Sequence, residues 1–224
     1  MSKHEVRTPG KVRAIFCNLI EPHKFKDERT GKEVGEPKYD ITLSLTPEDM
    51  KPLYATAIAA ANEAWPGQDF SKGYAFPFKR TEREAEKKRA KLAKKGKSEA
   101  DIVKQLEIYE PGHFLLTARS NFPVTLSYVN GGKVVAIPTD DRALHKDKFY
   151  NGCYVVAILE FVTYPPKKDG DQPGVSCYLK QVFFHSHGKR IGGEADVSVF
   201  NDYIGQSSQE DPTGGARAGD GLPF

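Results

Sequence analysis

Long hydrophobic runs are absent from this sequence of 224 residues: no apolar stretch approaches the ~20 residues that a membrane-spanning helix needs. The N-terminal segment MSKHEVRTPG has none of the apolar core of a signal peptide. Cysteine is scarce, and Cys17, Cys153 and Cys177 are widely spaced and odd in number. These absences predict a cytoplasmic protein that does not contact membranes and whose cysteines are reduced, buried thiols.

Catalytic motifs are missing as well. The sequence has no Walker A loop, no GxGxxG after a strand, no HExxH and no GxSxG. No two cysteines have the spacing of zinc ligands. We therefore expect no catalytic residue, no metal and no cofactor, and predict that the protein is not an enzyme. A metal-dependent nuclease that uses Asp40, Glu160, His185 and His187 stays an alternative.

The aromatic content is high and the positive charge is concentrated. The chain has 13 Phe, 10 Tyr and 1 Trp among 38% hydrophobic residues, which is ample for a core. The net charge is only +3, but residues 79–97 hold ten Lys or Arg against three Glu, a local charge of +7. This segment is either a surface for a polyanion or a solvated helix.

The first half of the chain alternates in a way that predicts strands over 11–20 and 38–45. In the first strand, the alternation places Phe16 on the same face as Val12 and Ala14. The stretch 21–37 is rich in turn-forming residues. A helix is expected to begin at Thr46-Pro47, with a possible restart at Pro52, and to end after Trp65.

Two further helices are expected over 82–95 and 99–109, because Thr81 with Glu84 and Ser98 with Asp101 have capping-box spacing. The first of them has almost no apolar stripe, so it must face water or a partner. After residue 112 the patterns predict a strand over 113–120, a hairpin over 124–138 with its turn at Asn130-Gly131, and strands over 153–165 and 174–184.

These elements predict a mainly β protein: an OB-fold-like five-stranded β-barrel with a helical insertion and a disordered C-terminal tail. We expect the barrel domain to cover residues 1–204, with a basic helical hairpin inserted at 79–110. The tail, residues 205–224, has no apolar periodicity but ends in the apolar Leu222-Pro223-Phe224. An apolar tip on a polar tether is typical of a peptide that binds a partner protein.

The recurring functional pattern is an aromatic residue next to Lys, Arg or Asn at a strand end or in a loop. Single-stranded nucleic acid suits this pattern, because cations bind phosphates while exposed rings stack on bases. The candidate DNA-binding residues are Lys24, Lys26, Lys38, Phe78, Lys79, Arg80, Lys87, Lys88, Arg89, Arg119, Asn121, Phe122, Tyr150, Tyr154, Tyr164, Lys167, Lys168, Tyr178 and Lys180. The rings among them are the stacking candidates, whereas Tyr39 is expected to be buried by its alternation. The outward faces of the strands at 38–45 and 113–120 suit either a shallow nucleic-acid groove or ordinary exposure to solvent.

Several blocks of the sequence resemble one family in the same order: GKVRAIFCNLIEP, GEPKYDITLSLTPED, FPFKR, GHFLLTARS, KFYNGCYVVAILEFVTYP and GVSCYLKQVFF. The family is that of the single-stranded DNA-binding proteins of tailed bacteriophages, and the resemblance covers residues 9–193. It implies an OB fold, cooperative binding of single-stranded DNA during phage replication, and a tail that moderates binding. The chain departs from the family in its long lysine-rich hairpin and in a tail that is less acidic than usual.

The resemblance implies a protein that coats single-stranded DNA, with little sequence preference, during phage replication or recombination in the host cytoplasm. The apolar tip also resembles that of bacterial single-stranded DNA-binding proteins. It implies that Asp220, Leu222, Pro223 and Phe224 bind a replication protein such as a polymerase, helicase or primase. A homo-oligomer or a cooperative filament on DNA is also possible. A strand-annealing recombination mediator, and an interaction protein whose basic hairpin docks on an acidic partner, remain alternatives.

Overall fold

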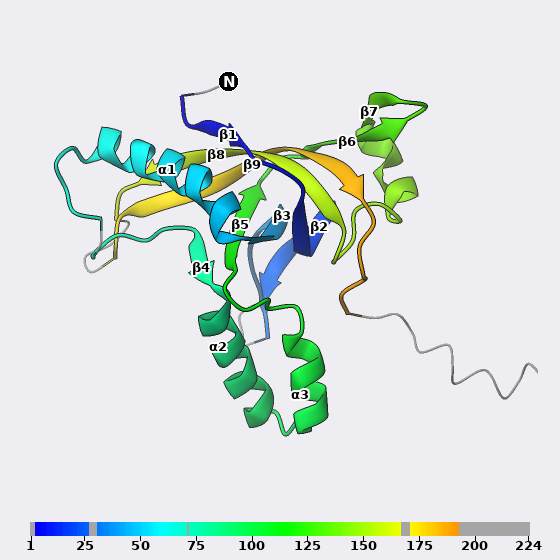
Figure 1. Ribbon diagram of the computed structural model, residues 1–224, viewed down its shortest axis with the longest axis horizontal. Helices are drawn as coiled ribbons and strands as arrows, with labels where there is room; N and C mark the ends of the chain where they lie inside the picture. The colour runs from blue at the N-terminus through cyan, green and yellow to red at the C-terminus, as the bar shows by residue number, and fades with distance from the viewer. Residues whose placement is uncertain (1–2, 27–30, 71, 167–170, 193–224) are drawn as a thin grey trace, which may run out of the picture. The chain divides into compact units, whose positions relative to one another are not determined.

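Five strands pair into a closed barrel, and Figure 1 shows their course. They are β2 (Val12–Lys26), β3 (Glu33–Leu45), β5 (Phe114–Ser120), β8 (Tyr154–Tyr164) and β9 (Gly174–Ser186). β3 pairs antiparallel with β2 and with β5, β5 pairs parallel with β9, and β8 pairs antiparallel with β9 and with β2, which completes the ring. This barrel confirms the predicted OB-like fold, including the helix between its early strands.

The computed structural model describes residues 3–26, 31–70, 72–166 and 171–192, with the backbone alone for 25 and 26. The predicted boundary at 204/205 and the tail lie outside these residues. Within the described residues, no helix is both long enough and apolar enough to cross a membrane.

The barrel interior is filled by alternate residues of each strand. In β3, Ile41 and Leu43 are fully buried and lie opposite Ala118 and Leu116 of β5, which are also fully buried. Because side chains alternate across a strand, the residues between them face outward. Tyr39, expected to be buried, is half-buried, packs against the core and has the Arg142 guanidinium 5.4 Å from its ring centre.

The strand β2 contains a bulge, and this corrects the predicted orientation of Phe16. The register with β3 shifts between Ala14 and Phe16, because Ile15 is an extra residue in β2. Ala14 and Ile15 are both buried, whereas Phe16 lies opposite Thr42 and is 38% exposed. The bulge therefore turns Phe16 out of the core face that simple alternation assigned to it.

The β2–β3 pair also continues beyond the barrel as a two-stranded ribbon. Residues 21–26 and 33–37, expected to be turn-rich, are strand, and the pairing extends to Lys26 opposite Glu33. Between 33 and 36 every residue is exposed. Neither face of this part of the ribbon is covered, so the sequence has no apolar alternation there to reveal the strands.

The helix α1 (Pro47–Ala64) packs on the barrel through Leu53, Ala57, Ala60 and Ala61. The Thr46 side chain caps it by accepting a hydrogen bond from the Asp49 amide, as predicted. Pro52 does not reset its start, because it lies inside the helix.

The first insertion contains β4 (Phe78–Arg80), α2 (Thr81–Lys94) and α3 (Glu99–Leu106). Figure 1 shows α2 and α3 as a hairpin that extends away from the barrel. Ser98 caps α3 as predicted, by accepting from the Asp101 amide. Thr81 does not cap α2: it is the first helical residue, is buried, and its hydroxyl lies within 2.9 Å of the His113 carbonyl oxygen.

The second insertion, between β5 and β8, contains β6 (Thr125–Asn130), β7 (Lys133–Ile137) and the 3₁₀ helix η1 (Thr139–His145). The predicted hairpin is present, and Gly131 and Gly132 form its turn with φ of 57° and 77°. β6 pairs parallel with β9, and β7 lies at the end of the sheet. At the opposite end of the sheet, the short β1 (Glu5–Arg7) pairs with β8.

Candidate nucleic-acid interface

The outer surface of β2, β3, β5 and β9 presents two rows of side chains, here called the barrel face. One row runs from Phe16 through Thr42 to Thr117. The second row runs Asn18, Asp40, Arg119 and Tyr178, each opposite the next on the neighbouring strand. Directly paired residues of adjacent strands point to the same side, so these groups share one surface.

The two rings of the barrel face lie on its outermost strands. Phe16 on β2 is 38% exposed and Tyr178 on β9 is 44% exposed. Three strand spacings separate β2 from β9, on the order of 14 Å along the barrel surface. That separation leaves room for a nucleic-acid strand that stacks one base on each ring. A third ring, Phe122, follows β5 and is 76% exposed.

The cations of the barrel face are Arg119 and Lys38, and both are exposed. Within the described part of the chain, neither has a hydrogen bond or an ion pair to another side chain. Lys38 lies opposite His23 in the β2–β3 ribbon. An unpaired cation can bind a phosphate without first breaking an ion pair, so these two side chains are suited to contact a DNA backbone.

The floor between the rings is polar and held by internal hydrogen bonds. The Thr42 and Thr117 hydroxyls are 3.0 Å apart, and the Asn18 amide donates to the Asp40 carboxylate at 2.7 Å. The His23 ring lies 3.7 Å from the same carboxylate. Asp40 is thus engaged from two sides, which limits its repulsion of a phosphate.

The loop after β5 holds Phe122 in place. The Phe122 amide donates to the Ser120 hydroxyl at 3.1 Å, and that hydroxyl donates to the Phe122 carbonyl at 2.8 Å. This tight local turn fixes the backbone and leaves the ring in solvent. Arg119, Asn121 and Phe122 therefore form one exposed group at the end of β5, as the sequence pattern predicted.

Two predicted stacking rings pack against other parts of the protein: Tyr150 is buried and Phe78 is half-buried. Tyr150 is only 9% exposed, its hydroxyl bonds to the Gly188 backbone, and the Arg190 guanidinium lies 3.9 Å from its ring centre. Phe78 packs against Tyr54 and Phe161, with ring centres 5.7 and 5.8 Å apart. Segments distant in sequence cover these rings, which is why a neighbouring Asn or Lys misled the sequence interpretation.

The other predicted residues are scattered over the molecule. Tyr154 and Tyr164 are half-buried, and Lys11 lies 5.4 Å from the Tyr154 ring centre. Several predicted cations have acidic partners. The pairs are Lys24 with Glu33, Lys79 and Lys87 with Glu84, Arg89 with Glu99, and Lys180 with Glu160. Arg80 lies over the Phe114 ring and Lys88 is half-buried on α2.

Some predicted residues lie outside the described part of the chain. They are the side chain of Lys26, together with Lys167, Lys168, Asp220, Leu222, Pro223 and Phe224. Conversely, the sequence interpretation missed Phe16. A bulge leaves no mark in an alternation pattern, but the run of apolar residues Ala14, Ile15 and Phe16 was a signal that one of them must leave the core.

The residues of the nuclease alternative do not converge. Asp40 on β3 and Glu160 on β8 are separated by β5 and β9 in register, again on the order of 14 Å. Two metal ions of a nuclease lie only ~4 Å apart and need shared ligands. Among the described residues, no three His, Cys, Asp or Glu side chains gather as a metal site would require.

Cys177 is not suited to bind a metal either. Burial raises the pKa of Cys177, so this thiol stays protonated.

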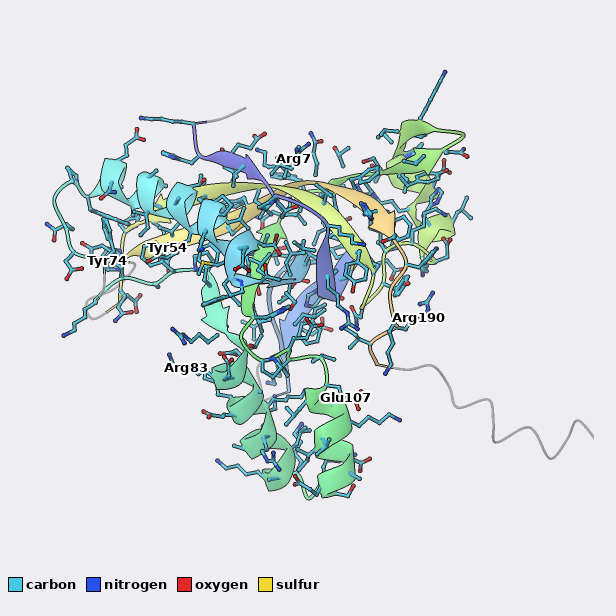
Figure 2. The ribbon with its side chains drawn as sticks, in the orientation of Figure 1. Arg7, Tyr54, Tyr74, Arg83, Glu107 and Arg190 are labelled. Atoms are coloured by element: carbon cyan, nitrogen blue, oxygen red, sulfur yellow. The ribbon has the colours of Figure 1, made fainter. Side chains whose placement is uncertain are left out.

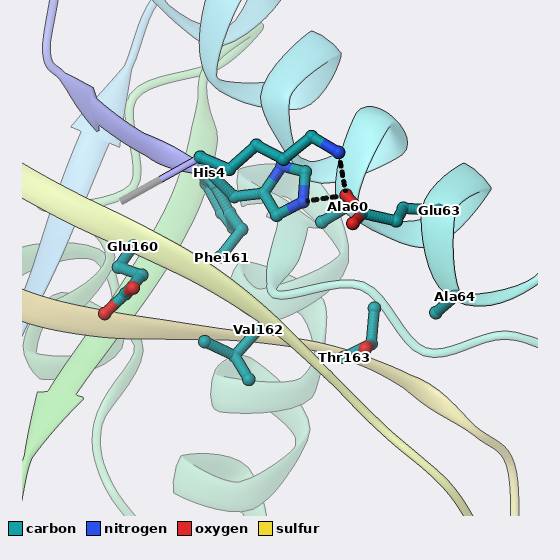
Figure 3. A pocket seen from close by; sticks show the side chains of 9 residues that line it. His4, Ala60, Glu63, Ala64, Glu160, Phe161, Val162 and Thr163 are labelled. Atoms are coloured by element: carbon teal, nitrogen blue, oxygen red, sulfur yellow. Dashed lines mark hydrogen bonds and ion pairs between the residues drawn. The ribbon is translucent and has the colours of Figure 1, made fainter. Parts of the chain in front are cut away.

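A shallow cavity of about 310 Å³ lies elsewhere, between the N-terminal segment, α1 and β8 (Figure 3). Its Glu63 carboxylate is already paired with Lys3 at 2.9 Å and with His4 at 2.8 Å. Phe161 and Val162 form part of its wall. The cavity has no exposed ring beside an unpaired cation, so it does not extend the barrel face.

A closed five-stranded barrel with rings and unpaired cations on its outer face defines the class of the OB-fold binding proteins. The particular family follows from the sequence. The profile of the Enterobacter phage Enc34 ssDNA-binding protein family matches residues 5–212, and the chain belongs to this family. This confirms the resemblance found in the sequence. No curated protein matches the chain by sequence.

Solved structures share the fold. The single-stranded DNA-binding protein from bacteriophage Enc34 in complex with ssDNA aligns with a TM-score of 0.55 at 15% identity, over 85% of this chain and 91% of that one. A C-terminal truncation of the Enc34 protein aligns with a TM-score of 0.56 at 13% identity, over 84% of this chain and 90% of that one. The barrel architecture is therefore common to proteins of very different sequence.

Proposed function

We propose that this protein binds single-stranded DNA on the barrel face without making or breaking a bond. It coats the strand during replication or recombination of a phage genome in the host cytoplasm. The observation that carries the proposal is the placement of exposed Phe16 and Tyr178 on either side of unpaired Arg119. Membership of the Enc34 ssDNA-binding protein family supports the same function.

The chemistry of the barrel face favours binding with little sequence preference. A ring stacks on any base, and a cation binds any phosphate, so neither contact reads a base edge. Stacking also requires unpaired bases, because the bases of a duplex are already stacked on each other. The barrel face is therefore expected to prefer a single strand to a blunt duplex.

Fluorescence anisotropy with labelled oligo(dT) tests this function directly. Duplex and RNA of the same length serve as controls, and each titration is repeated with magnesium. We expect tight binding of oligo(dT), weaker binding of the blunt duplex and an intact probe. A folded protein that leaves oligo(dT) unbound would contradict the proposal, and a probe cleaved in magnesium would restore the nuclease alternative.

For the tail, residues 205–224, which lie outside the described residues, two roles follow from the sequence. Phe224 docks in an apolar pocket on a replication protein such as a polymerase, helicase or primase. Leu222 and Pro223 add apolar contacts. Between such encounters, the acidic groups of the tail compete weakly with DNA phosphates for the barrel face, at a high effective concentration.

The position where the described chain ends supports the competition role. The Ile191 amide donates to the Asn151 carbonyl at 2.8 Å, and the Asn151 side chain accepts from the Cys17 amide at 2.8 Å. Cys17 adjoins Phe16, so the described chain ends close to the barrel face. Deleting residues 205–224 should tighten oligo(dT) binding severalfold, because exposed charges are well screened. Unchanged or weaker binding would remove this role.

The recruitment role has a separate test. Pull-down of host and phage replication proteins should succeed with the full chain and fail when Phe224 alone is deleted. Recovery of the same partner by the Phe224-deleted chain would show that the tip is not the binding segment.

Self-association is proposed through the edge strand β7. Val134 and Val135 are 68% and 39% exposed, an unusual amount of apolar surface for a strand at the end of a sheet. Antiparallel pairing with β7 of a second copy, centred on Val135, places Lys133 opposite Ile137, so that like charges do not meet. Sedimentation velocity should show a dimer that V134K abolishes; a monomer at all concentrations would exclude this contact.

A further inference from the structure

The helix α2 carries a stripe of cations that the barrel face does not explain. At 100° per residue, Arg83, Lys87, Lys91 and Lys94 fall within an arc of about 80°. These four residues are called the cationic stripe. Leu92, which is buried, lies on the opposite side of the helix. Figure 2 shows Arg83 on the side of α2 away from α3.

Two of the four stripe residues, Lys87 and Lys91, interact with other groups of the protein. Glu84 pairs with Lys87 at 2.7 Å. Arg83 and Lys94 have no side-chain partner within the described residues. Glu82 is held elsewhere, because its carboxylate accepts from the Gly112 amide at 2.6 Å, which lowers the pKa of Glu82. Glu99 on α3 pairs with Arg89, outside the stripe.

The stripe offers charge but no stacking. The sequence of α2, TEREAEKKRAKLAK, contains no aromatic residue, so this helix cannot hold unpaired bases by their faces. From Arg83 to Lys94 the stripe extends about 16 Å along the helix axis. Each phosphate contact releases about 0.9 counterions from a duplex but only about 0.7 from a single strand. A row of cations without aromatic rings therefore gains more affinity from binding a duplex than from binding a single strand.

The root of the hairpin places the stripe next to the barrel face. Glu110, just after α3, pairs with Arg13 of β2 at 2.8 Å, and His113 bonds to the Ser44 hydroxyl of β3 at 2.9 Å. Arg13 lies on β2 only three residues before Phe16. A strand that leaves the barrel face at this end meets the base of α2.

We propose that the cationic stripe binds the phosphates of duplex DNA that flanks a single strand held on the barrel face, so that the protein prefers single-strand–duplex junctions. This inference rests on the proposed function. The stripe supplies sequence-independent contacts to the duplex backbone, while Phe16 and Tyr178 engage the unpaired bases. The protein thereby binds first where a single strand emerges from a duplex.

Three DNA probes test this proposal with the full chain: oligo(dT), a blunt DNA hairpin, and the same hairpin with an oligo(dT) overhang. The wild type should bind the overhang probe more tightly than either other probe. The variant R83Q/K87Q/K94Q should lose roughly tenfold in affinity for the overhang probe and keep its affinity for oligo(dT), with the salt slope on the overhang probe reduced by about 2.7.

The control variant R7Q/K51Q/K72Q removes the same charge from exposed positions outside α2 and should retain the junction preference. Hydroxyl-radical footprinting with the wild type should show protection of the duplex backbone next to the overhang. An overhang probe bound no more tightly than oligo(dT), an equal loss of oligo(dT) binding in the stripe variant, or no duplex protection would each overturn this proposal. Failure of the wild type to bind oligo(dT) would instead overturn the proposed function.

Discussion

Phe16 is exposed because one extra residue in β2 shifts the side chains that follow it, as far as Leu19, to the opposite face. Before the bulge, Val12 and Ala14 point inward, and after it Leu19 does so. A large apolar side chain in water carries a cost of on the order of 1.5–3 kcal/mol relative to burial. The proposed function gives this exposed ring a role, because a stacked base would cover it.

Replacing Phe16 or Tyr178 by Ala should weaken oligo(dT) binding by about fivefold to 150-fold each, as expected for the loss of one stacked base. Both rings are substantially exposed, so the fold should survive the change. Anisotropy titrations measure the effect, with circular dichroism to check folding. The matched control is L144A, which removes a side chain that is 77% exposed on η1, outside the barrel face. Equal affinities for all three variants and the wild type would move the site away from the barrel face.

Arg142 has a structural role that the sequence did not reveal. It is 4% exposed, its guanidinium donates to the Leu19 and Val124 carbonyl oxygens, and it lies over the Tyr39 ring. One side chain thus connects η1 to β2, β3 and the segment after β5. The sequence analysis did not single out Arg142, because a buried arginine is rare unless it is paired.

The variant R142A should lower the free energy of unfolding by about 2–4 kcal/mol, because it leaves buried carbonyl groups without donors. Urea denaturation followed by circular dichroism measures this change. R7A, which removes an exposed arginine from β1, is the control and should leave stability within about 0.5 kcal/mol. A loss below 1 kcal/mol in R142A would mean that water or a rearranged η1 satisfies these carbonyl groups.

At the scale of elements, the sequence predicted those parts that bury one face. β3, α1, β5, β8 and β9 lie where apolar alternation or caps placed them, to within a few residues. The β2–β3 ribbon was not predicted because its outer part is uncovered on both faces. The short strands β1 and β4 were not predicted because three residues are too few to show an alternating pattern. Among the residues of the barrel face, the sequence predicted Arg119 and Tyr178. The exposure of Phe16 could not be predicted because it depends on a bulge. The burial of Tyr150, which lies outside the barrel face, depends on packing by residues 187–190.

The helical hairpin should be dispensable for the fold. Arg80 pairs with Phe114 across β4 and β5, and the Thr81 amide donates to the His113 carbonyl at 3.2 Å. Replacing residues 82–112 by Asn-Gly should therefore join β4 to β5 as an ordinary two-residue hairpin.

The shortened protein should unfold cooperatively and bind oligo(dT) within about threefold of the wild type, because charges on the hairpin are screened from the barrel face. It should also lose the preference for junctions. Thermal denaturation and anisotropy with the overhang probe measure both properties. A shortened chain that folds but no longer binds oligo(dT) would show that the hairpin belongs to the single-strand site itself.

At the scale of the molecule, closure of the barrel depends on contacts that no local pattern encodes. The parallel pairing of β5 with β9 brings Arg119 opposite Tyr178, and β8 then returns to β2 through Val155 opposite Val12. The local alternation of apolar residues predicted the strands but not their order around the barrel. The resemblance between blocks of sequence supplied that order, because a family preserves topology when most residues have changed.

The net charge of the protein is only +3, but its cations are unevenly distributed, so the affinity for DNA should depend on the salt concentration. On oligo(dT), the barrel face and the neighbouring strand-end lysines are expected to neutralise about four phosphates, which gives a slope of log K against log salt near −3. R119Q should reduce this slope by about 0.7, the contribution of one contact to a single strand, whereas R7Q on β1 should not change it. Titrations in a potassium chloride series measure both. A slope near zero for the wild type would leave stacking as the whole source of affinity, and an unchanged slope in R119Q would place the DNA backbone away from β5.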